Sequence, residues 1–256
     1  MDEQNIRSAR SDGVLKLMLY RPEKRNALTG AMYDTLRTQL EAAAADDGVR
    51  SVLLSGCANY FCAGNDIGGF EAVRSLPLDD RPGFRFMRAF AAFPKPVVAA
   101  VTGDAIGIGA TLLLHCDLVY AADNARLRFP FVDVGLVPEF AASLLLPRLA
   151  GQARAAELLM LGGYFDAAQA QGFGLVSGVL PADEVAAHAE RAALALAAKP
   201  AVALQATKRL LKEPVLEDIQ RVMESEMHEL NRRLNSEETQ AILGAILKKP
   251  ATPKRV

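Results

Sequence analysis

The sequence has few cysteines, almost no net charge and no long apolar segment. Its 256 residues include three cysteines, and 29 basic residues against 30 acidic ones leave a net charge of −1. This near-neutral balance gives no electrostatic reason to expect binding to nucleic acid or to an anionic membrane. No apolar run approaches the roughly 20 residues that cross a bilayer, so we expect no membrane span.

The cysteines and the two ends of the chain predict the compartment. Cys57, Cys62 and Cys116 form an odd set without C-x-x-C spacing, which predicts buried free thiols in a reducing environment. The polar start MDEQNIRSARSDG does not resemble a signal peptide, and the end KKPATPKRV matches no retention or peroxisomal signal. We therefore expect a cytoplasmic protein. No group of His, Cys, Asp and Glu has metal-ligand spacing, so we expect no metal ion.

Apolar periodicity predicts an α/β chain with a helical C-terminal region. Apolar runs predict strands at 14–20, 51–55, 97–101, 117–121 and 175–180, and a helix capped by Thr29 lies between the first two. Further helices are expected at 106–115, 141–149, 152–161 and 183–198. From residue 201 only helices are predicted, at 217–234 and from Asn235 onward. We therefore divide the chain into a core, 1–200, and a helical region, 201–256, that contacts a partner subunit or covers its own core.

The segment 68–94 is less regular than its neighbours. It contains Pro77, Pro82 and Gly83, but Phe84, Met87 and Phe90 have helical spacing. Two interpretations stay open at this point: a lid over an apolar pocket, or a surface helix with its loop.

Two glycine-containing turns carry the strongest functional signal. One is Cys62-Ala63-Gly64-Asn65-Asp66, and the other is the run from Ala105 to Ala110, A-I-G-I-G-A. Each follows an apolar strand, and such turns leave backbone N–H groups unpaired. Two turns that face each other would form an oxyanion hole for a carbonyl oxygen that gains negative charge. The glycine spacing matches neither a dinucleotide-binding nor a P-loop motif.

Among acids and bases, Glu139 is the leading candidate. It follows the mainly apolar stretch from Phe131 to Pro138, and a carboxylate against apolar walls would have a raised pKa and could transfer a proton. A solvated first-turn glutamate is the alternative. Asp133 is a second candidate, with a structural role favoured, and His115 in the apolar run LLLHC is typical of a core histidine.

Together these motifs resemble the crotonase superfamily, that is, the enoyl-CoA hydratase/isomerase family. The resemblance covers nearly the whole chain. Its motifs are Arg21 and Pro22 with the run RNAL at 25–28, the first glycine turn at 61–66, the second at 103–117, and the segment 129–138. The resemblance implies a crotonase-like spiral of ββα units with a C-terminal helical trimerisation region. It also implies an acyl-CoA substrate, no further cofactor, and a homotrimer or dimer of trimers.

The resemblance also implies a set of site residues. The backbone N–H groups of Ala63 and Ile108 would form the oxyanion hole, with Ile108 in place of the more common glycine. Glu139 would be the catalytic residue. The residues expected to bind substrate or CoA are Arg25, Ala27, Ala63, Gly64, Asn65, Asp66, Ile67, Gly107 and Phe131.

The carboxylates decide which reaction is expected. Family hydratases carry two glutamates at positions that align with Thr111 and Phe131 here, and neither is a carboxylate. Dienoyl-CoA isomerases share a stretch like 132–136 but carry a second acid where Phe131 stands. Glu139 instead matches the single glutamate of Δ3,Δ2-enoyl-CoA isomerases, which move a double bond with one base. An enoyl-CoA hydratase is the alternative within the class, and a non-catalytic acyl-CoA-binding or protein-binding homologue is the alternative outside it.

Overall fold

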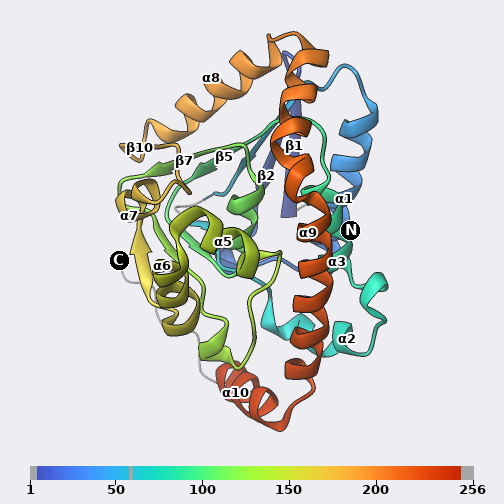
Figure 1. Ribbon diagram of the computed structural model, residues 1–256, viewed down its shortest axis with the longest axis vertical. Coiled ribbons are helices and arrows are strands. Elements are labelled where there is room, and N and C mark those ends of the chain that lie inside the picture. The colour runs from blue at the N-terminus through green and yellow to red at the C-terminus, as the bar shows by residue number, and fades with distance from the viewer. Residues whose placement is uncertain (1–4, 58–59, 249–256) are drawn as a thin grey trace.

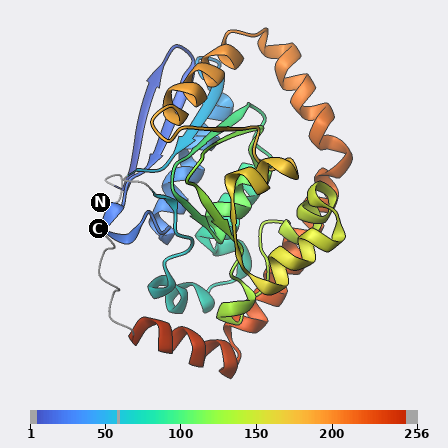
Figure 2. The same cartoon turned by 90° about the vertical axis from the view of Figure 1, so that its left-hand side faces the viewer.

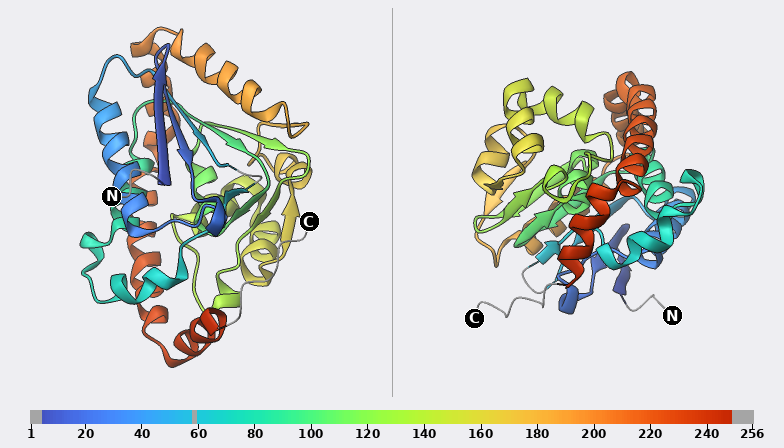
Figure 3. Two further views of the ribbon diagram at one scale, coloured as in Figure 1. Left: turned by 180° about the vertical axis from the view of Figure 1, so that it is seen from behind. Right: turned by 90° about the horizontal axis from the view of Figure 1, so that it is seen from below.

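Two sheets form the centre of the fold. The computed structural model describes residues 5–57 and 60–248. The larger sheet has the strand order β1-β2-β3-β5-β7-β10, in which β1 and β2 form an antiparallel hairpin and the other pairs are parallel. Its strands are β1 (Ile6–Ser11), β2 (Val14–Leu19), β3 (Ser51–Ser55), β5 (Val97–Val101), β7 (Leu118–Ala122) and β10 (Gly178–Leu180). Figure 3 shows the hairpin at the outer edge of this sheet.

A second, four-stranded sheet follows from the first. Its order is β4-β6-β8-β9, with strands β4 (Tyr60–Cys62), β6 (Asp104–Ile106), β8 (Arg126–Arg128) and β9 (Tyr164–Asp166). Each of β3, β5 and β7 in the first sheet is followed along the chain by β4, β6 or β8 in the second. The chain therefore advances in repeated two-strand turns, and the glycine turns after β4 and β6 come to lie side by side because these strands pair.

Helices complete each turn and cover the sheets. Helix α1 (Gly30–Ala45) begins as predicted, since the Thr29 side chain accepts a hydrogen bond from the Met32 N–H. The others are α2 (Phe70–Arg74), α3 (Pro82–Ala91), α4 (Ile108–Thr111), α5 (Ala142–Ala150), α6 (Gln152–Ala156), α7 (Ala167–Gly172), α8 (Val185–Ala197), α9 (Ala201–Leu234) and α10 (Glu237–Lys248). The predicted α/β architecture with C-terminal helices is confirmed.

Several element boundaries differ from the prediction. The helix expected at 106–115 begins two residues later, at Ile108, because β6 extends to Ile106, and its second half, Leu112–His115, is a 3-10 helix. The helix expected at 217–234 begins earlier, at Ala201. Helix α9 continues through Pro214, which is exposed. Strand β10 is half as long as predicted. The three-residue strands of the second sheet were not expected, since such short segments show no periodicity, and β1 was not expected because its sequence is almost entirely polar and exposed.

Helix α9 runs along one side of the molecule for most of its long axis (Figure 1). Figure 2 shows α9 and α10 along the outside of the molecule. The second half of α9 is the buried half, with Ile219, Met223 and Met227 in the core. The division at residue 200 and the role of 201–256 in oligomerisation stay predictions, and residues 249–256 lie outside the described part.

The described cysteines are free, and Cys62 is buried whereas Cys57 and Cys116 are only half-buried. The expectation of buried thiols is therefore confirmed for Cys62 alone. Within residues 5–57 and 60–248, no helix is both long and apolar enough to cross a membrane.

Candidate active site

Glu139 lies in the interior, in the irregular segment between β8 and α5. Only 5% of its surface is exposed, so the alternative of a solvated glutamate is wrong. Burial raises the pKa of Glu139 to about 8; the negative charge of Glu226 adds to this, and a hydrogen bond from Asn65 opposes it. A carboxyl group with this pKa can both take up and release a proton near neutral pH.

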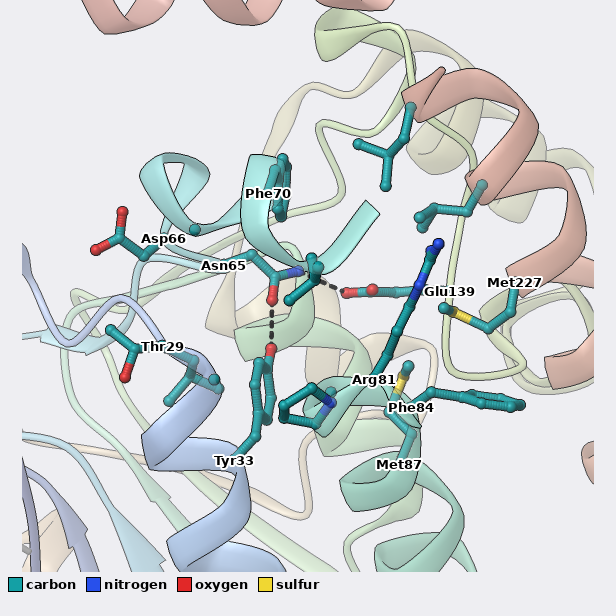
Figure 4. Close-up of a pocket in the computed structure, with 18 of the residues that line it drawn as sticks. Thr29, Tyr33, Asn65, Asp66, Phe70, Arg81, Phe84, Met87, Glu139 and Met227 are labelled. Carbon is teal, nitrogen blue, oxygen red and sulfur yellow. Dashed lines mark hydrogen bonds between the residues drawn. The ribbon is translucent and has the colours of Figure 1, made fainter. Parts of the chain in front are cut away.

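A short hydrogen-bond chain leads from helix α1 to Glu139 (Figure 4). The Tyr33 hydroxyl donates to Oδ1 of Asn65 at 2.5 Å, and Nδ2 of Asn65 donates to Oε1 of Glu139 at 3.4 Å. Burial raises the pKa of Tyr33 well above its ordinary value, and the charge of Glu139 raises it further, so the phenol remains a donor. These two hydrogen bonds fix the orientation of the Asn65 side-chain amide and direct its Nδ2 to the Glu139 carboxylate.

The backbone beside Glu139 adopts an uncommon conformation. Phe140 and Ala141 both have positive φ, 62° and 54°, which non-glycine residues rarely adopt. The buried His115 stabilises this turn through two contacts: its Nε2 bonds to the Phe140 carbonyl at 2.7 Å, and its ring stacks on the Phe140 ring. Burial lowers the pKa of His115 to about 3, so a neutral imidazole donates this bond. The predicted core role of His115 is confirmed.

Glu226, on α9, fixes the other side of the same turn. Its carboxylate accepts hydrogen bonds from the Ala141 N–H at 2.6 Å, the Ser143 N–H at 2.9 Å and the Ser143 hydroxyl at 2.5 Å. It thereby caps the start of α5 from outside that helix. Burial raises the pKa of Glu226 to about 7, although these hydrogen bonds from Ser143 and Ala141 lower it.

The two glycine turns contact each other closely, as predicted. A Cβ atom on Gly64 would lie 3.1 Å from the Ile106 carbonyl oxygen, and one on Gly109 would lie 2.5 Å from the Cys62 carbonyl oxygen. Gly64 and Gly107 both have positive φ. Glycine is therefore required here for the approach of the two backbones and for their conformation.

The Ala63 prediction is corrected by the backbone hydrogen bonds. The Ala63 N–H donates to the Arg25 carbonyl at 3.0 Å, so it is already paired. The Leu28 N–H donates to the Gly64 carbonyl, and the Leu28 carbonyl accepts a hydrogen bond from the Asp66 N–H. Because Gly64 and Asp66 flank Asn65, the Asn65 N–H faces away from Leu28. Among the described residues, neither the Asn65 N–H nor the Ile108 N–H has a backbone acceptor. The Gly109 N–H, next along the second turn, likewise has no backbone acceptor among these residues, so Asn65 and Ile108 carry two of the donors that the turns leave available.

A mainly apolar cavity of about 160 Å³ lies in front of Glu139. It is bounded by α1, the 65–73 segment, α3, the 131–139 segment and α9 (Figure 4). The segment 68–94 therefore supplies part of the cavity wall, through Phe70, Phe84 and Met87. The side chains of Met227, Leu230 and Leu234 close the cavity from α9.

The structure brings together some of the predicted site residues. Asn65, Asp66, Phe131 and Glu139 line the cavity. The other predicted residues do not line the cavity; they belong to the two turns, the 25–28 segment and the short 3-10 helix Ile67–Gly69: Arg25, Ala27, Ala63, Gly64, Ile67, Gly107 and Ile108. Two carboxylates, those of Asp66 and Glu139, line the cavity in the described part of the chain. Asp66 forms an ion pair with Arg21 at 2.7 Å, which leaves Glu139 as the one without an ion-pair partner.

Three polar residues of the site were not predicted: Tyr33, Arg81 and Glu226. Tyr33 shares its helix face with core residues, and Glu226 lies on a charged helix 87 positions after Glu139, so local pattern separated neither from ordinary residues. Asp133 is exposed and pairs with Arg128 at 2.8 Å, which agrees with the structural role favoured for it. Within the described ranges, no group of His, Cys, Asp and Glu is arranged to hold a metal ion.

Fold and site together define a chain of the crotonase superfamily. Residues 9–249 match the family model described as Enoyl-CoA hydratase/isomerase. Because this match spans almost the entire sequence, the chain belongs to the enoyl-CoA hydratase/isomerase family. The expected crotonase fold is thereby confirmed.

This chain is similar to relatives named as isomerases and to others named as hydratases. It is 34% identical over 247 residues to Enoyl-CoA delta isomerase 2 of Rattus norvegicus, covering 93% of this chain and 62% of that relative. It is 38% identical over 207 residues to 2,3-dehydroadipyl-CoA hydratase of Escherichia coli (strain K12), covering 80% of each. The solved structure of Pseudomonas aeruginosa OdaA superimposes with a TM-score of 0.93 at 46% identity, covering 96% of this chain and 100% of that one. Family membership is shown, and these names leave the reaction open.

Proposed function

We propose that the protein is a Δ3,Δ2-enoyl-CoA isomerase of fatty-acid metabolism that uses Glu139 as its single acid–base residue. The observation that carries this proposal is the buried Glu139 carboxyl, with a pKa of about 8, at an apolar cavity that holds no second unpaired carboxylate among the described residues. Coenzyme A would enter as part of the substrate, and no other cofactor takes part in the reaction.

The reaction needs one base and one oxyanion site. The ionised Glu139 removes a proton from C2 of a 3-enoyl thioester, and the electron pair moves toward the thioester carbonyl to give a dienolate. The Asn65 and Ile108 N–H groups bind the enolate oxygen. Glu139 then returns the proton at C4, the C2–C3 double bond forms, and the carboxylate is regenerated. Losing one such backbone donor typically costs about 3 kcal/mol of transition-state stabilisation.

The surroundings of Glu139 favour isomerisation over hydration. The positions of the two hydratase glutamates hold a buried Thr111 and the Phe131 side chain that lines the cavity. Glu226 is another buried acid whose charge acts on Glu139, but its oxygens accept bonds from Ala141 and Ser143, and it does not line the cavity. An apolar wall and a single acid suit a proton transfer that excludes water.

A paired assay tests the proposal. The wild type and Glu139→Gln are given trans-3-hexenoyl-CoA, with formation of the conjugated 2-enoyl thioester followed by absorbance, and separately trans-2-hexenoyl-CoA, with hydration followed. We expect isomerisation by the wild type that falls about 10²–10⁴-fold in Glu139→Gln. Asp133→Asn is the matched control, since Asp133 is an exposed carboxylate in the same segment.

The other functions predict different outcomes. Hydration that survives in Glu139→Gln would contradict the assignment of the acid and favour a hydratase. Binding of acyl-CoA without turnover of either substrate would favour a non-catalytic homologue.

A further inference from the structure

Arg81 is a buried cation at the cavity that has spare hydrogen-bonding capacity. Only 4% of the residue is exposed, although it stands at the start of α3. Its Nε donates to the Leu76 carbonyl at 3.2 Å, and its Nη2 donates to the Arg74 carbonyl at 2.9 Å and to Oδ1 of Asn231 at 2.6 Å. Its Nη1 is buried and has no partner within residues 5–57 and 60–248.

This guanidinium also lacks a counter-charge. The ion pairs of the described residues include none with Arg81, and its three partners are two carbonyls and one side-chain amide, all uncharged. Burial lowers the pKa of Arg81, but an arginine side chain keeps its proton in proteins. A buried charge without a partner is unfavourable, so such groups are normally paired.

Arg81 lines the cavity in front of Glu139. Figure 4 shows its side chain extending from the start of α3 toward α9, among the other lining side chains. It is the one basic residue among those that line this cavity in the described chain, and Phe84, Leu230 and Leu234 beside it are apolar. The contacts through Nε and Nη2 hold the guanidinium in one orientation, and Nη1 is its one nitrogen without a hydrogen-bond acceptor among the described residues.

A plain hydrocarbon acyl chain would not satisfy this donor. It would cover Nη1 with methylene groups and leave a charged N–H without an acceptor in an apolar site. A carboxylate would supply both the acceptor and the missing negative charge, in a charge-assisted hydrogen bond. The orphan donor is therefore explained by a ligand that carries an anion at this end of the cavity.

We propose that the acyl group of the substrate carries a carboxylate at the end distant from the thioester, and that Arg81 binds it. The physiological substrate class is then the mono-CoA thioester of an unsaturated dicarboxylic acid. This inference rests on the proposed function for the position of the thioester, and it adds a specificity-determining residue that touches substrate but takes no part in the proton transfer.

Binding to the wild type tests this without any catalysis. The probes are the saturated thioesters adipoyl-CoA and suberoyl-CoA, which cannot isomerise, and their counterparts hexanoyl-CoA and octanoyl-CoA, with affinities measured by titration calorimetry. We expect at least one ω-carboxyl thioester to bind ten times or more tightly than its counterpart. If neither ω-carboxyl thioester binds more tightly than its counterpart, the carboxylate proposal is overturned and the isomerase proposal stands. If none of the four binds, both proposals fail.

Variants separate recognition from a structural role. Arg81→Met should lose the preference for the ω-carboxyl thioester while its affinity for hexanoyl-CoA or octanoyl-CoA changes less than threefold. Arg85→Met is the matched control, because Arg85 is exposed on the same helix. Asn231→Ala removes one structural partner but keeps the guanidinium, so it should retain the preference. An equal loss of affinity for all four probes in Arg81→Met, or a preference that survives in it, overturns the proposal. If Arg81→Met does not fold, the wild-type comparison and Asn231→Ala decide.

Discussion

The Nδ2 atom of Asn65 lies 3.4 Å from Oε1 of Glu139 and donates a hydrogen bond to it. The same residue carries one of the backbone N–H groups that the glycine turns leave available. Asn65 therefore links the side chain that would move the proton to the backbone that would bind the oxyanion. A displacement of Asn65 should therefore affect both.

Tyr33→Phe tests the fixed orientation of Asn65. The substitution removes the 2.5 Å hydrogen bond from the Tyr33 hydroxyl and leaves Oδ1 of Asn65 without this donor. We expect kcat for isomerisation to fall roughly 5- to 30-fold, as for the loss of one hydrogen bond, with a smaller change in KM. Tyr120→Phe, on β7, should leave kcat unchanged. A Tyr33→Phe enzyme with wild-type kcat would contradict the role of the Tyr33 hydroxyl in positioning Asn65.

The rate should depend on pH through Glu139. The residue must be ionised to take the C2 proton, and burial raises its pKa to about 8. We expect kcat/KM to rise about tenfold per pH unit below pH 8 and to level off above it. Asn65→Leu removes a hydrogen bond that lowers this pKa, so the rising limb should move to higher pH. A profile that is flat between pH 6 and 9 would show that another group acts as the base.

The same ionisation should affect stability. In the folded protein Glu139 keeps its proton up to about pH 8, whereas in the unfolded chain it loses it near 4.5. The unfolded state therefore binds fewer protons in this window, and the free energy of unfolding of the wild type decreases as pH rises from about 4.5 to 8. Glu139→Gln cannot ionise. It should match the wild type near pH 5 and exceed it at pH 8 by on the order of 3 kcal/mol, since one pKa unit corresponds to about 1.4 kcal/mol.

Urea denaturation at pH 5, 6.5 and 8 measures this difference. Asp133→Asn serves as the control, because Asp133 is an exposed carboxylate in the same segment of the chain. A constant offset between Glu139→Gln and the wild type at all three pH values would refute the coupling.

Glu226 should influence the reaction without touching the substrate. Its negative charge raises the pKa of Glu139, so Glu226→Gln should move the rising limb of the pH profile to lower pH. Glu226→Ala also leaves three donors of Ala141 and Ser143 without their acceptor, and should lower the free energy of unfolding by about 2–3 kcal/mol. Glu224→Gln is the matched control, exposed on the same helix. An unmoved pH profile in Glu226→Gln would limit Glu226 to a structural role.

Gly109→Ala tests the close approach of the two glycine turns. The new Cβ atom would lie 2.5 Å from the Cys62 carbonyl oxygen and 2.7 Å from the Cys62 Cβ, so the turns must move apart. We expect a loss of about 1–3 kcal/mol in stability, as for other overpacked sites, and a fall in kcat. Gly244→Ala is the control: nothing lies within 4 Å of its Cβ position in α10, and alanine there should stabilise the helix by up to about 1 kcal/mol. Unchanged stability and kcat in Gly109→Ala would contradict the tight contact.

The parts of the site that follow from local pattern were predictable from the sequence. The glycine turns, the buried strands before them and Glu139 each show in a short window of residues, because backbone conformation and burial depend on nearby side chains. The correction from Ala63 to Asn65 depends on the pairing of Leu28 with the first turn, a contact between segments more than 30 residues apart. Nothing in the local sequence fixes which N–H that pairing leaves open.

Arg81 and Glu226 illustrate the same limit. Charged residues at a helix start or on a long polar helix are ordinarily solvated, and their burial here results from the packing of α9 against the 70–91 segment and the 139–143 turn. Pro214 likewise predicts a helix end near that position, since the residue before a proline usually leaves the helical region. The structure continues α9 through it, so tertiary packing outweighed the local preference.

The capping of the 139–143 turn by Glu226 has a consequence for the order of assembly. During synthesis the strands, both glycine turns and Glu139 leave the ribosome well before residue 226 does. Until α9 docks, the left-handed backbone at Phe140 and Ala141 lacks one of its two supports, and the cavity lacks its wall of Met227, Leu230 and Leu234. A nascent chain that has completed both sheets would therefore still lack a finished site, and activity would begin only after α9 has been made and has docked.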